Sequence, residues 1–211
     1  MTYKTIFFDL DDTIYPSTSG LWPAIGQRID MFIHEKVGLL PEEIRGFRSN
    51  LYKEYGTTMR GLKILYDINE KEYLKYVHDI PLENYIQPDK ELRQVLNQYP
   101  QDKWIFTNAD MDHAKRVLDV VGLGECFNGI IDILQLSPYC KPQPEAYQIA
   151  LKVAGVMDPK ECVFIDDREM NLDPARHMGF FTILIDELSR NNNNHVKIQS
   201  LKYLSDILIT S

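Results

Sequence analysis

The chain lacks features that would place it in a membrane, among disulfide-bonded proteins or among zinc proteins. Of its 211 residues, 44% are hydrophobic, yet no stretch approaches the roughly 20 consecutive apolar residues of a membrane-spanning helix. Its three cysteines, Cys126, Cys140 and Cys162, are odd in number and widely spaced, without a Cys-x-x-Cys pattern. We therefore expect a soluble globular protein with reduced thiols and no membrane partner.

Basic residues are also few, with 23 Lys and Arg against 31 Asp and Glu, giving a net charge of -8. Such a balance does not suit a protein that holds a nucleic-acid polymer, although one locally basic pocket can still receive a phosphorylated small molecule. The chain reaches Asp9 before any signal-peptide apolar region can form, so we expect a cytoplasmic protein. No internal repeat is present, and the sequence indicates no oligomeric state.

Two periodicities divide the chain. In residues 15–85 apolar side chains recur at helical spacing, as at Ile25, Ile29 and Phe32, without a convincing strand. From Pro88 onward, helical stretches alternate with short apolar runs, which is typical of a parallel sheet covered by helices on both faces. The expected strands cover residues 3–8, 104–106, 130–134, 163–165 and 181–185.

The predicted fold class is therefore α/β, a Rossmann-like parallel sheet with helices on both faces and a small all-helical cap insertion. The partners of the first strand lie beyond residue 100, so the helical block interrupts the sheet domain rather than preceding it. We expect a core domain of residues 1–14 plus 86–211 and a helical cap domain of residues 15–85.

Three carboxylates follow the first apolar run, where a buried strand would meet solvent. If the strand stays extended through residue 11, Asp9 and Asp11 point to the same side, because side chains alternate along a strand. Asp is disfavoured in strands and costly to bury unpaired, so the cluster indicates a bound cation or a reaction that uses it. Asp is also common in turns after strands, and we assign Asp12 to that role.

Polar residues follow the other expected strands as well. In open parallel sheets, ligands bind at the carboxyl ends of the strands. Those positions bring together Thr107, Asn108, Lys141, Asp166 and Asp167. Crowded carboxylates raise one another's pKa unless a hard cation is bound, and oxygen ligands favour Mg²⁺. Hydroxyl, amide and ammonium groups can donate hydrogen bonds to phosphate, so Mg²⁺ with a phosphate group is the predicted occupant.

These segments, taken in order, resemble the four signature motifs of the haloacid dehalogenase-like hydrolase superfamily. The motifs are Phe8-Asp9-Leu10-Asp11-Asp12-Thr13, Thr107-Asn108, Lys141-Pro142 and Asp166-Asp167. The resemblance spans nearly the whole chain, and the insertion resembles the C1 type of helical cap. Residues 55–62, 76–80 and 105–110 are similar to the pyrimidine 5'-nucleotidase branch.

The resemblance implies a Mg²⁺-dependent phosphomonoesterase that hydrolyses pyrimidine nucleoside 5'-monophosphates through an aspartyl-phosphate. It makes Asp9 the nucleophile and Asp11 the acid and base. Thr107 and Lys141 would hold the transferring phosphoryl group, with Asn108 assisting.

The resemblance also supplies a metal-ligand set. Mg²⁺ would be bound by Asp9, the Asp11 backbone carbonyl and the acids Asp166 and Asp167, of which Asp167 is expected to bind directly. In the cap, Thr58 and Arg60 are candidates for substrate contact. His113 has no second ligand or triad partner nearby in the sequence, so we assign it a packing role.

Four functions other than hydrolysis of pyrimidine nucleotides can be compared with the sequence. The substrate can be another phosphorylated metabolite, such as a sugar phosphate. A receiver-like signalling module would place its phospho-acceptor on the third strand and carry no long early insertion. A non-catalytic binding protein would not need the complete set of groups. A dehalogenase needs no Mg²⁺ and does not ordinarily use an acid at the position of Asp11.

Overall fold

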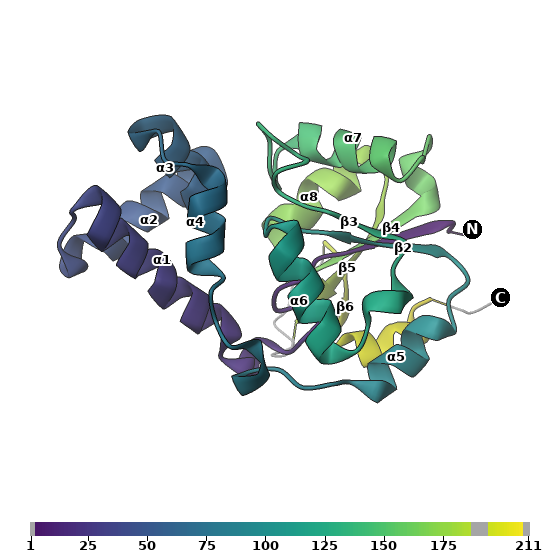
Figure 1. The fold of residues 1–211 in the computed structure, drawn as a ribbon. Coiled ribbons are helices and arrows are strands. Elements are labelled where there is room, and N and C mark those ends of the chain that lie inside the picture. The colour runs from purple at the N-terminus through teal and green to yellow at the C-terminus, as the bar shows by residue number, and fades with distance from the viewer. Residues whose placement is uncertain (1–2, 187–193, 209–211) are drawn as a thin grey trace. The chain divides into compact units, whose positions relative to one another are not determined.

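The computed structural model describes residues 3–186 and 194–208, and the chain divides into two compact units (Figure 1). Residues 1–18 and 86–211 form one unit, which we call the α/β unit. Ser19–Tyr85 form the other, which we call the helical unit. Each unit is described by itself.

The α/β unit is built on a parallel sheet, which confirms the predicted fold class. Its strand order is β3-β2-β1-β4-β5-β6 within the described residues. Thr5 pairs with Asp102 on one side and Cys162 on the other, so β1 lies in the middle of the sheet. The strands are β1 (Thr5–Phe8), β2 (Asp102–Phe106), β3 (Gly129–Ile131), β4 (Cys162–Asp166), β5 (Phe181–Ile185) and β6 (Val196–Ile198).

Helices cover both faces of this sheet. The helices α7 (Pro144–Val153) and α8 (Glu169–Met178) lie on one face, and α5 (Lys90–Asn97) and α6 (Met111–Val121) lie on the other (Figure 1). Side chains alternate along each strand, so Phe7, Phe106 and Phe164 point to the same face, where they pack with Tyr147 of α7. Strands buried on both faces explain the nearly continuous apolar runs of the sequence.

The third strand is shorter than expected. We predicted a strand over residues 130–134, but β3 ends at Ile131 and a turn follows. The Asp132 carboxylate accepts hydrogen bonds from the backbone N–H groups of Met111 and Gln135, both at 2.9 Å. These bonds stabilise a turn in place of further strand, as Asp side chains often do.

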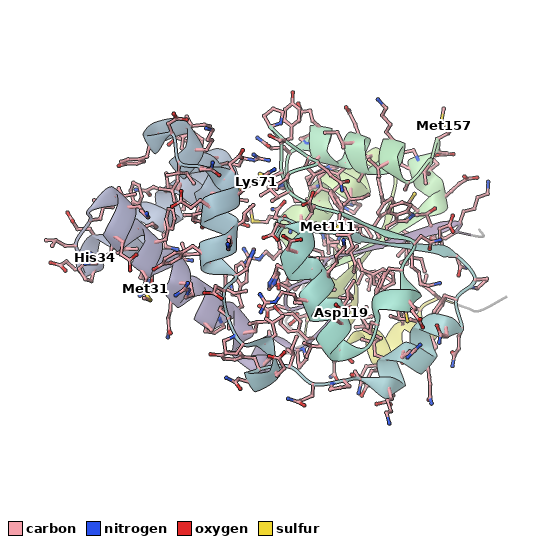
Figure 2. All side chains as sticks on the ribbon, in the orientation of Figure 1. Met31, His34, Lys71, Met111, Asp119 and Met157 are labelled. Carbon is pink, nitrogen blue, oxygen red and sulfur yellow. The ribbon has the colours of Figure 1, made fainter. Side chains whose placement is uncertain are left out.

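The helical unit contains α1 (Leu21–Val37), α2 (Pro41–Tyr55), α3 (Thr58–Tyr66) and α4 (Glu70–Val77). Met31 and His34 lie on the exposed side of α1 (Figure 2). The opposite sides of the helices supply the apolar core: Ile25, Ile29, Phe32, Ile33, Ile44, Leu51, Met59, Leu62, Tyr73, Leu74 and Val77. No helix in the described part of the chain is both long enough and apolar enough to span a membrane.

Candidate active site

The end of β1 places Asp9 at the side of the sheet where the carboxyl ends of the strands lie. The strand ends at Phe8, but the Asp9 N–H still donates to the Ile165 carbonyl of β4 at 2.8 Å. A turn begins at Asp11, and Asp12 adopts a left-handed conformation with φ of 59°, which Asp tolerates better than most residues. The strand therefore does not extend to residue 11, and alternation along it does not set the direction of Asp11.

Lys141 joins two of the predicted acids. Its Nζ lies 2.5 Å from Oδ1 of Asp9 and 2.8 Å from Oδ2 of Asp166. The ammonium also lies 5.2 Å from the ring centroids of both Phe106 and Phe164. Burial alone would lower the pKa of Lys141, but the Asp166 and Asp9 carboxylates outweigh it and raise that pKa. Lys141 is thus a buried, charged ammonium.

Asp166 is held by two groups in addition to Lys141, the Arg168 N–H and the Asn171 side chain. Its Oδ1 accepts a hydrogen bond from the Arg168 N–H at 2.8 Å, and Asn171 Nδ2 lies 3.0 Å from both carboxylate oxygens. The Tyr147 hydroxyl donates in turn to the Asn171 carbonyl at 2.5 Å. The side chain of Asp166 is completely buried, and this network fixes its orientation.

Among the described residues, Asp9, Asp166 and Asp167 each offer one carboxylate oxygen, and these three oxygens lie within 4.8 Å of one another. Burial raises the pKa of Asp9 well above its usual value; Lys141 opposes this effect, and Asp166 and Asp167 add to it. Burial, together with the Asp166 charge, raises the pKa of Asp167 to about 7. The three acids outnumber the two cations beside them, which are the buried Lys141 and the partly exposed Arg168, whose Nε lies 3.9 Å from Oδ2 of Asp167.

The turn after β2 is tied to the segment that carries Lys141. Asn108 Nδ2 donates to the Lys141 carbonyl and Asn108 Oδ1 accepts from the Lys141 N–H, both at 2.9 Å. The Thr107 hydroxyl oxygen accepts from the Ala109 N–H at 2.9 Å, and its own proton remains available for donation. The Asn108 side chain thus positions Lys141, while its contact with phosphate stays a prediction.

Asp11 is bound by two residues that we had not placed in the site. Its Oδ1 lies 2.6 Å from the Tyr15 hydroxyl and 2.9 Å from Nε2 of His113. His113 packs in the interior, as one of its expected roles requires, but it is not isolated, because its fully buried ring contacts a predicted catalytic acid. Burial and the Asp11 charge raise the pKa of Tyr15 well above its usual value, so the hydroxyl stays protonated and donates.

The comparisons with known proteins identify a family for the chain. A family model for haloacid dehalogenase-like hydrolases matches residues 3–179, which include every strand-end acid described above. The chain belongs to the haloacid dehalogenase-like hydrolase family.

Relatives of this hydrolase include a yeast protein and several solved structures. This chain is 29% identical to phosphate metabolism protein 8 of Saccharomyces cerevisiae, over 97% of this chain and 70% of that protein. A phosphatase of the same family from Thermococcus onnurineus superimposes with a TM-score of 0.68 at 20% identity, covering 100% and 99% of the two chains.

Two further structures share the fold of this hydrolase. The Bacillus subtilis putative hydrolase YfnB, bound to magnesium, gives a TM-score of 0.70 at 17% identity, covering 99% of this chain and 100% of the other. The L-2-haloacid dehalogenase of Xanthobacter autotrophicus, with covalently bound chloropropionic acid, gives 0.62 at 16%, covering 98% of each chain. At such identities the likeness shows the fold alone, which both phosphatases and dehalogenases adopt.

The acids of the hydrolase fit a magnesium ion in their chemistry. Asp9, Asp166 and Asp167 offer hard carboxylate oxygens, which Mg²⁺ prefers over softer metals. Burial, and then the neighbouring acids, raises the pKa values of Asp9 and Asp167, and a divalent cation would stabilise their charged forms. The Asp11 side chain lies outside this group, and its backbone carbonyl stays a predicted ligand.

Two predicted substrate-binding residues of the hydrolase belong to the helical unit. Thr58 is the first residue of α3 and is buried. Arg60 follows in the first turn, where its buried guanidinium forms an ion pair with Glu70 of α4. Contact of Thr58 and Arg60 with substrate stays a prediction.

Proposed function

We propose that this hydrolase is a Mg²⁺-dependent phosphomonoesterase that works through an aspartyl-phosphate. The observation that carries the proposal is the surrounding of Asp9, which is buried at the end of β1 beside two further acids and 2.5 Å from the Lys141 ammonium. A carboxylate in this position can act as a nucleophile while a cation and an ammonium hold an anionic target beside it. The relative named phosphate metabolism protein 8, 29% identical over 97% of this chain, supports a reaction on phosphate.

In the first step, a carboxylate oxygen of Asp9 forms a bond to phosphorus and the bond between phosphorus and the ester oxygen breaks. Lys141 occupies Oδ1 of Asp9, so Oδ2 is the attacking oxygen. The electron pair of the broken bond stays on the ester oxygen, which takes a proton from Asp11 and leaves as an alcohol. Lys141 and Thr107 bind the oxygens of the transferring phosphoryl group.

In the second step, water attacks the phosphorus of the aspartyl-phosphate. Asp11, now a carboxylate, takes a proton from this water while the bond between phosphorus and Asp9 breaks. Inorganic phosphate leaves, and Asp9 and Asp11 return to their starting forms. Bound Mg²⁺ supplies positive charge that shields the anionic carboxylate from the anionic phosphate.

We propose pyrimidine nucleoside 5'-monophosphates as substrates. Support comes from residues 55–62, 76–80 and 105–110, which are similar to the pyrimidine 5'-nucleotidase branch. Thr58 and Arg60, in the first of these segments, are the proposed substrate contacts in the helical unit. A sugar phosphate is the alternative substrate class.

A dehalogenase is the second candidate, because one solved dehalogenase shares the fold. Halide leaves as an anion and needs no proton, so a dehalogenase has no use for an acid that serves the leaving group. The chain nevertheless holds Asp11 with two hydrogen bonds and gathers three further carboxylates beside it. These groups favour phosphate transfer over dehalogenation.

The first test is phosphate release from UMP, CMP, AMP, GMP, sugar phosphates and p-nitrophenyl phosphate, with chloride release from 2-chloropropionate measured in parallel. We expect UMP and CMP to be hydrolysed fastest, EDTA to stop the reaction and Mg²⁺ to restore it. Faster turnover of sugar phosphates would replace the substrate proposal, and turnover in EDTA would reject the metal. Chloride release without phosphate release would favour the dehalogenase.

The second test replaces the nucleophile. Asp9→Asn should lower the rate of phosphate release at least about a thousandfold, because an amide oxygen does not form the phosphoenzyme. Asp206→Asn, at an exposed position in the 3-10 segment Leu201–Asp206, is the control and should retain full activity. Normal turnover by the Asp9→Asn variant would remove Asp9 from the mechanism.

A further inference from the structure

We propose that Tyr15 and His113 form a clamp that positions Asp11 for proton transfer to the leaving group. The two donors reach the same carboxylate oxygen, Oδ1, from the Tyr15 hydroxyl at 2.6 Å and from His113 Nε2 at 2.9 Å. The proposal rests on the proposed function, since Asp11 acts there as the acid. Tyr15 and His113 are positioning residues, because their bonds are made to Asp11.

The local backbone brings Tyr15 back to Asp11. The N–H groups of Thr13 and Ile14 both donate to the Leu10 carbonyl, at 3.4 and 2.9 Å. These bonds close a helix-like turn after β1, in which residues four apart lie on one side, as Asp11 and Tyr15 do. The Tyr15 side chain is buried, so the surrounding packing restricts its rotation.

The start of α6 fixes His113 independently. Asp110 caps this helix, and its Oδ1 accepts a hydrogen bond from the His113 N–H at 2.9 Å. The His113 side chain is fully buried, so the ring has little room to turn away from Asp11. Two buried rings from segments about a hundred residues apart therefore hold one carboxylate.

The clamp selects the oxygen that carries the transferred proton. When Asp11 is a carboxylate, as it is after the first step, it has only acceptor sites, so in that form Nε2 of His113 carries the hydrogen of their bond. An oxygen that accepts from both Tyr15 and His113 is the poorer site for a carboxyl proton, so Oδ2 of Asp11 holds it. In the first step that proton passes from Oδ2 to the ester oxygen, which keeps the electron pair of the broken bond to phosphorus.

This role predicts an effect that depends on the leaving group. The alcohol of an alkyl phosphate such as UMP needs a proton as it departs, whereas p-nitrophenolate departs as a stable anion. Loss of the clamp misplaces the acid, and small misplacements of a catalytic group cost up to about a hundredfold in rate. We therefore expect Tyr15→Phe and His113→Ala to lower kcat/KM for UMP about ten- to a hundredfold and for p-nitrophenyl phosphate less than about threefold.

Two comparisons separate positioning from general damage to the fold. In an Asp11→Asn background, Tyr15→Phe and His113→Ala should change kcat/KM for UMP less than twofold, because the group that they position no longer transfers a proton. His113→Gln, whose amide can donate toward Asp11, should recover part of the loss seen in His113→Ala.

Matched controls use buried residues of the same type. The Tyr99 hydroxyl donates to the Leu208 carbonyl at 3.1 Å, and His195 lies between Thr182 and Asp173. Tyr99→Phe and His195→Gln should leave the ratio of kcat/KM for the two substrates unchanged, even where they lower stability.

The possible results lead to different conclusions. Equal losses on both substrates, or a full further loss in the Asp11→Asn background, would overturn the clamp while leaving the phosphatase intact. The function itself fails separately, if Asp9→Asn retains normal turnover. If one of Tyr15→Phe and His113→Ala does not fold, the other still tests the proposal, because each variant removes one of the two hydrogen bonds to Asp11.

Discussion

The two units of the chain each bury a basic side chain against acids, but their charges differ. In the α/β unit, Lys141 faces Asp9 and Asp166 directly, with Asp167 in the same group of carboxylates. In the helical unit, the buried Arg60 forms an ion pair with Glu70. The first arrangement gathers three acids around its cations, while the second joins a basic and an acidic side chain of two helices.

This difference separates a cluster of crowded carboxylates from an ion pair between two helices. Burying surplus carboxylates destabilises a fold, so a protein keeps them where a cation or a reaction uses them. A buried pair with matched charge has no such requirement and can hold two helices together, as Arg60 of α3 and Glu70 of α4 do. Charge balance thus distinguishes two clusters that both contain buried ions.

The largest expected effect comes from removing the ammonium of the unbalanced cluster. Lys141→Met should abolish phosphate release and lower the free energy of unfolding by about 3–5 kcal/mol, because buried acids lose their cation. Urea denaturation in EDTA measures the stability.

Lys202→Met is the matched control, since Lys202 also contacts two acids, Glu91 and Asp89, but at a more exposed position. It should cost less than about 1 kcal/mol and leave activity unchanged. Equal losses of unfolding free energy in Lys141→Met and Lys202→Met would show that the buried acids do not depend on the Lys141 ammonium for stability.

The next effect is a pH dependence of the metal-free protein. The pKa of Asp167 is about 7 in the folded chain against a usual 3.8, so between these values the folded state binds more protons than the unfolded state. The free energy of unfolding should therefore fall as pH rises from 3.8 through about 7, with no more than about 4 kcal/mol from this group. Thermal unfolding in EDTA at several pH values tests this.

Asp167→Asn should flatten that dependence, and Asp206→Asn should not. Added Mg²⁺ should raise the Tm more at pH 8 than at pH 5, because a protonated carboxyl group is a poor ligand. A Tm that rises with pH over the same interval in EDTA would show that the charged form of Asp167 does not destabilise the folded chain.

The smallest effect is expected in the balanced pair. Arg60→Met should destabilise the chain by about 1–3 kcal/mol, because Glu70 loses its partner but keeps some access to water. Arg60→Met combined with Glu70→Leu should return stability to within about 1 kcal/mol of the parent, as apolar replacement of buried ion pairs often does. If the double variant does not regain stability, Arg60 makes stabilising contacts beyond its pair with Glu70.

The polar residues that follow the strands could be predicted from the sequence, because each one comes directly after a short run of apolar residues. Apolar runs followed by Asp9, Thr107 and Asp166 indicate where buried strands meet polar groups, and parallel strands bring such ends to one edge. The limits of the strands were less predictable. Asp132 ends β3 through bonds to distant backbone groups, and β6, only three residues long and containing Lys197, has too short a pattern to be recognised.

The residues that orient the acids could not be predicted in this way. His113 is 102 residues from Asp11, and nothing in its own neighbourhood indicates a carboxylate partner. Asn171 lies in the first turn of α8, a position where Asn is ordinary, yet its side chain donates to Asp166 at 3.0 Å. Tyr15 is close to Asp11 in sequence, but only the turn that follows β1 shows that its hydroxyl returns to that carboxylate.

The central position of β1 has a consequence for synthesis of the chain. Thr5 pairs with Asp102 and Cys162, so the strand's neighbours leave the ribosome long after it does. The helical unit, Ser19–Tyr85, is complete before either neighbour emerges and has its own apolar core, so it can fold first. Until β2 and β4 arrive, the apolar residues Ile6, Phe7 and Phe8 lack the strands that flank them in the finished sheet, so this part of the core is completed late.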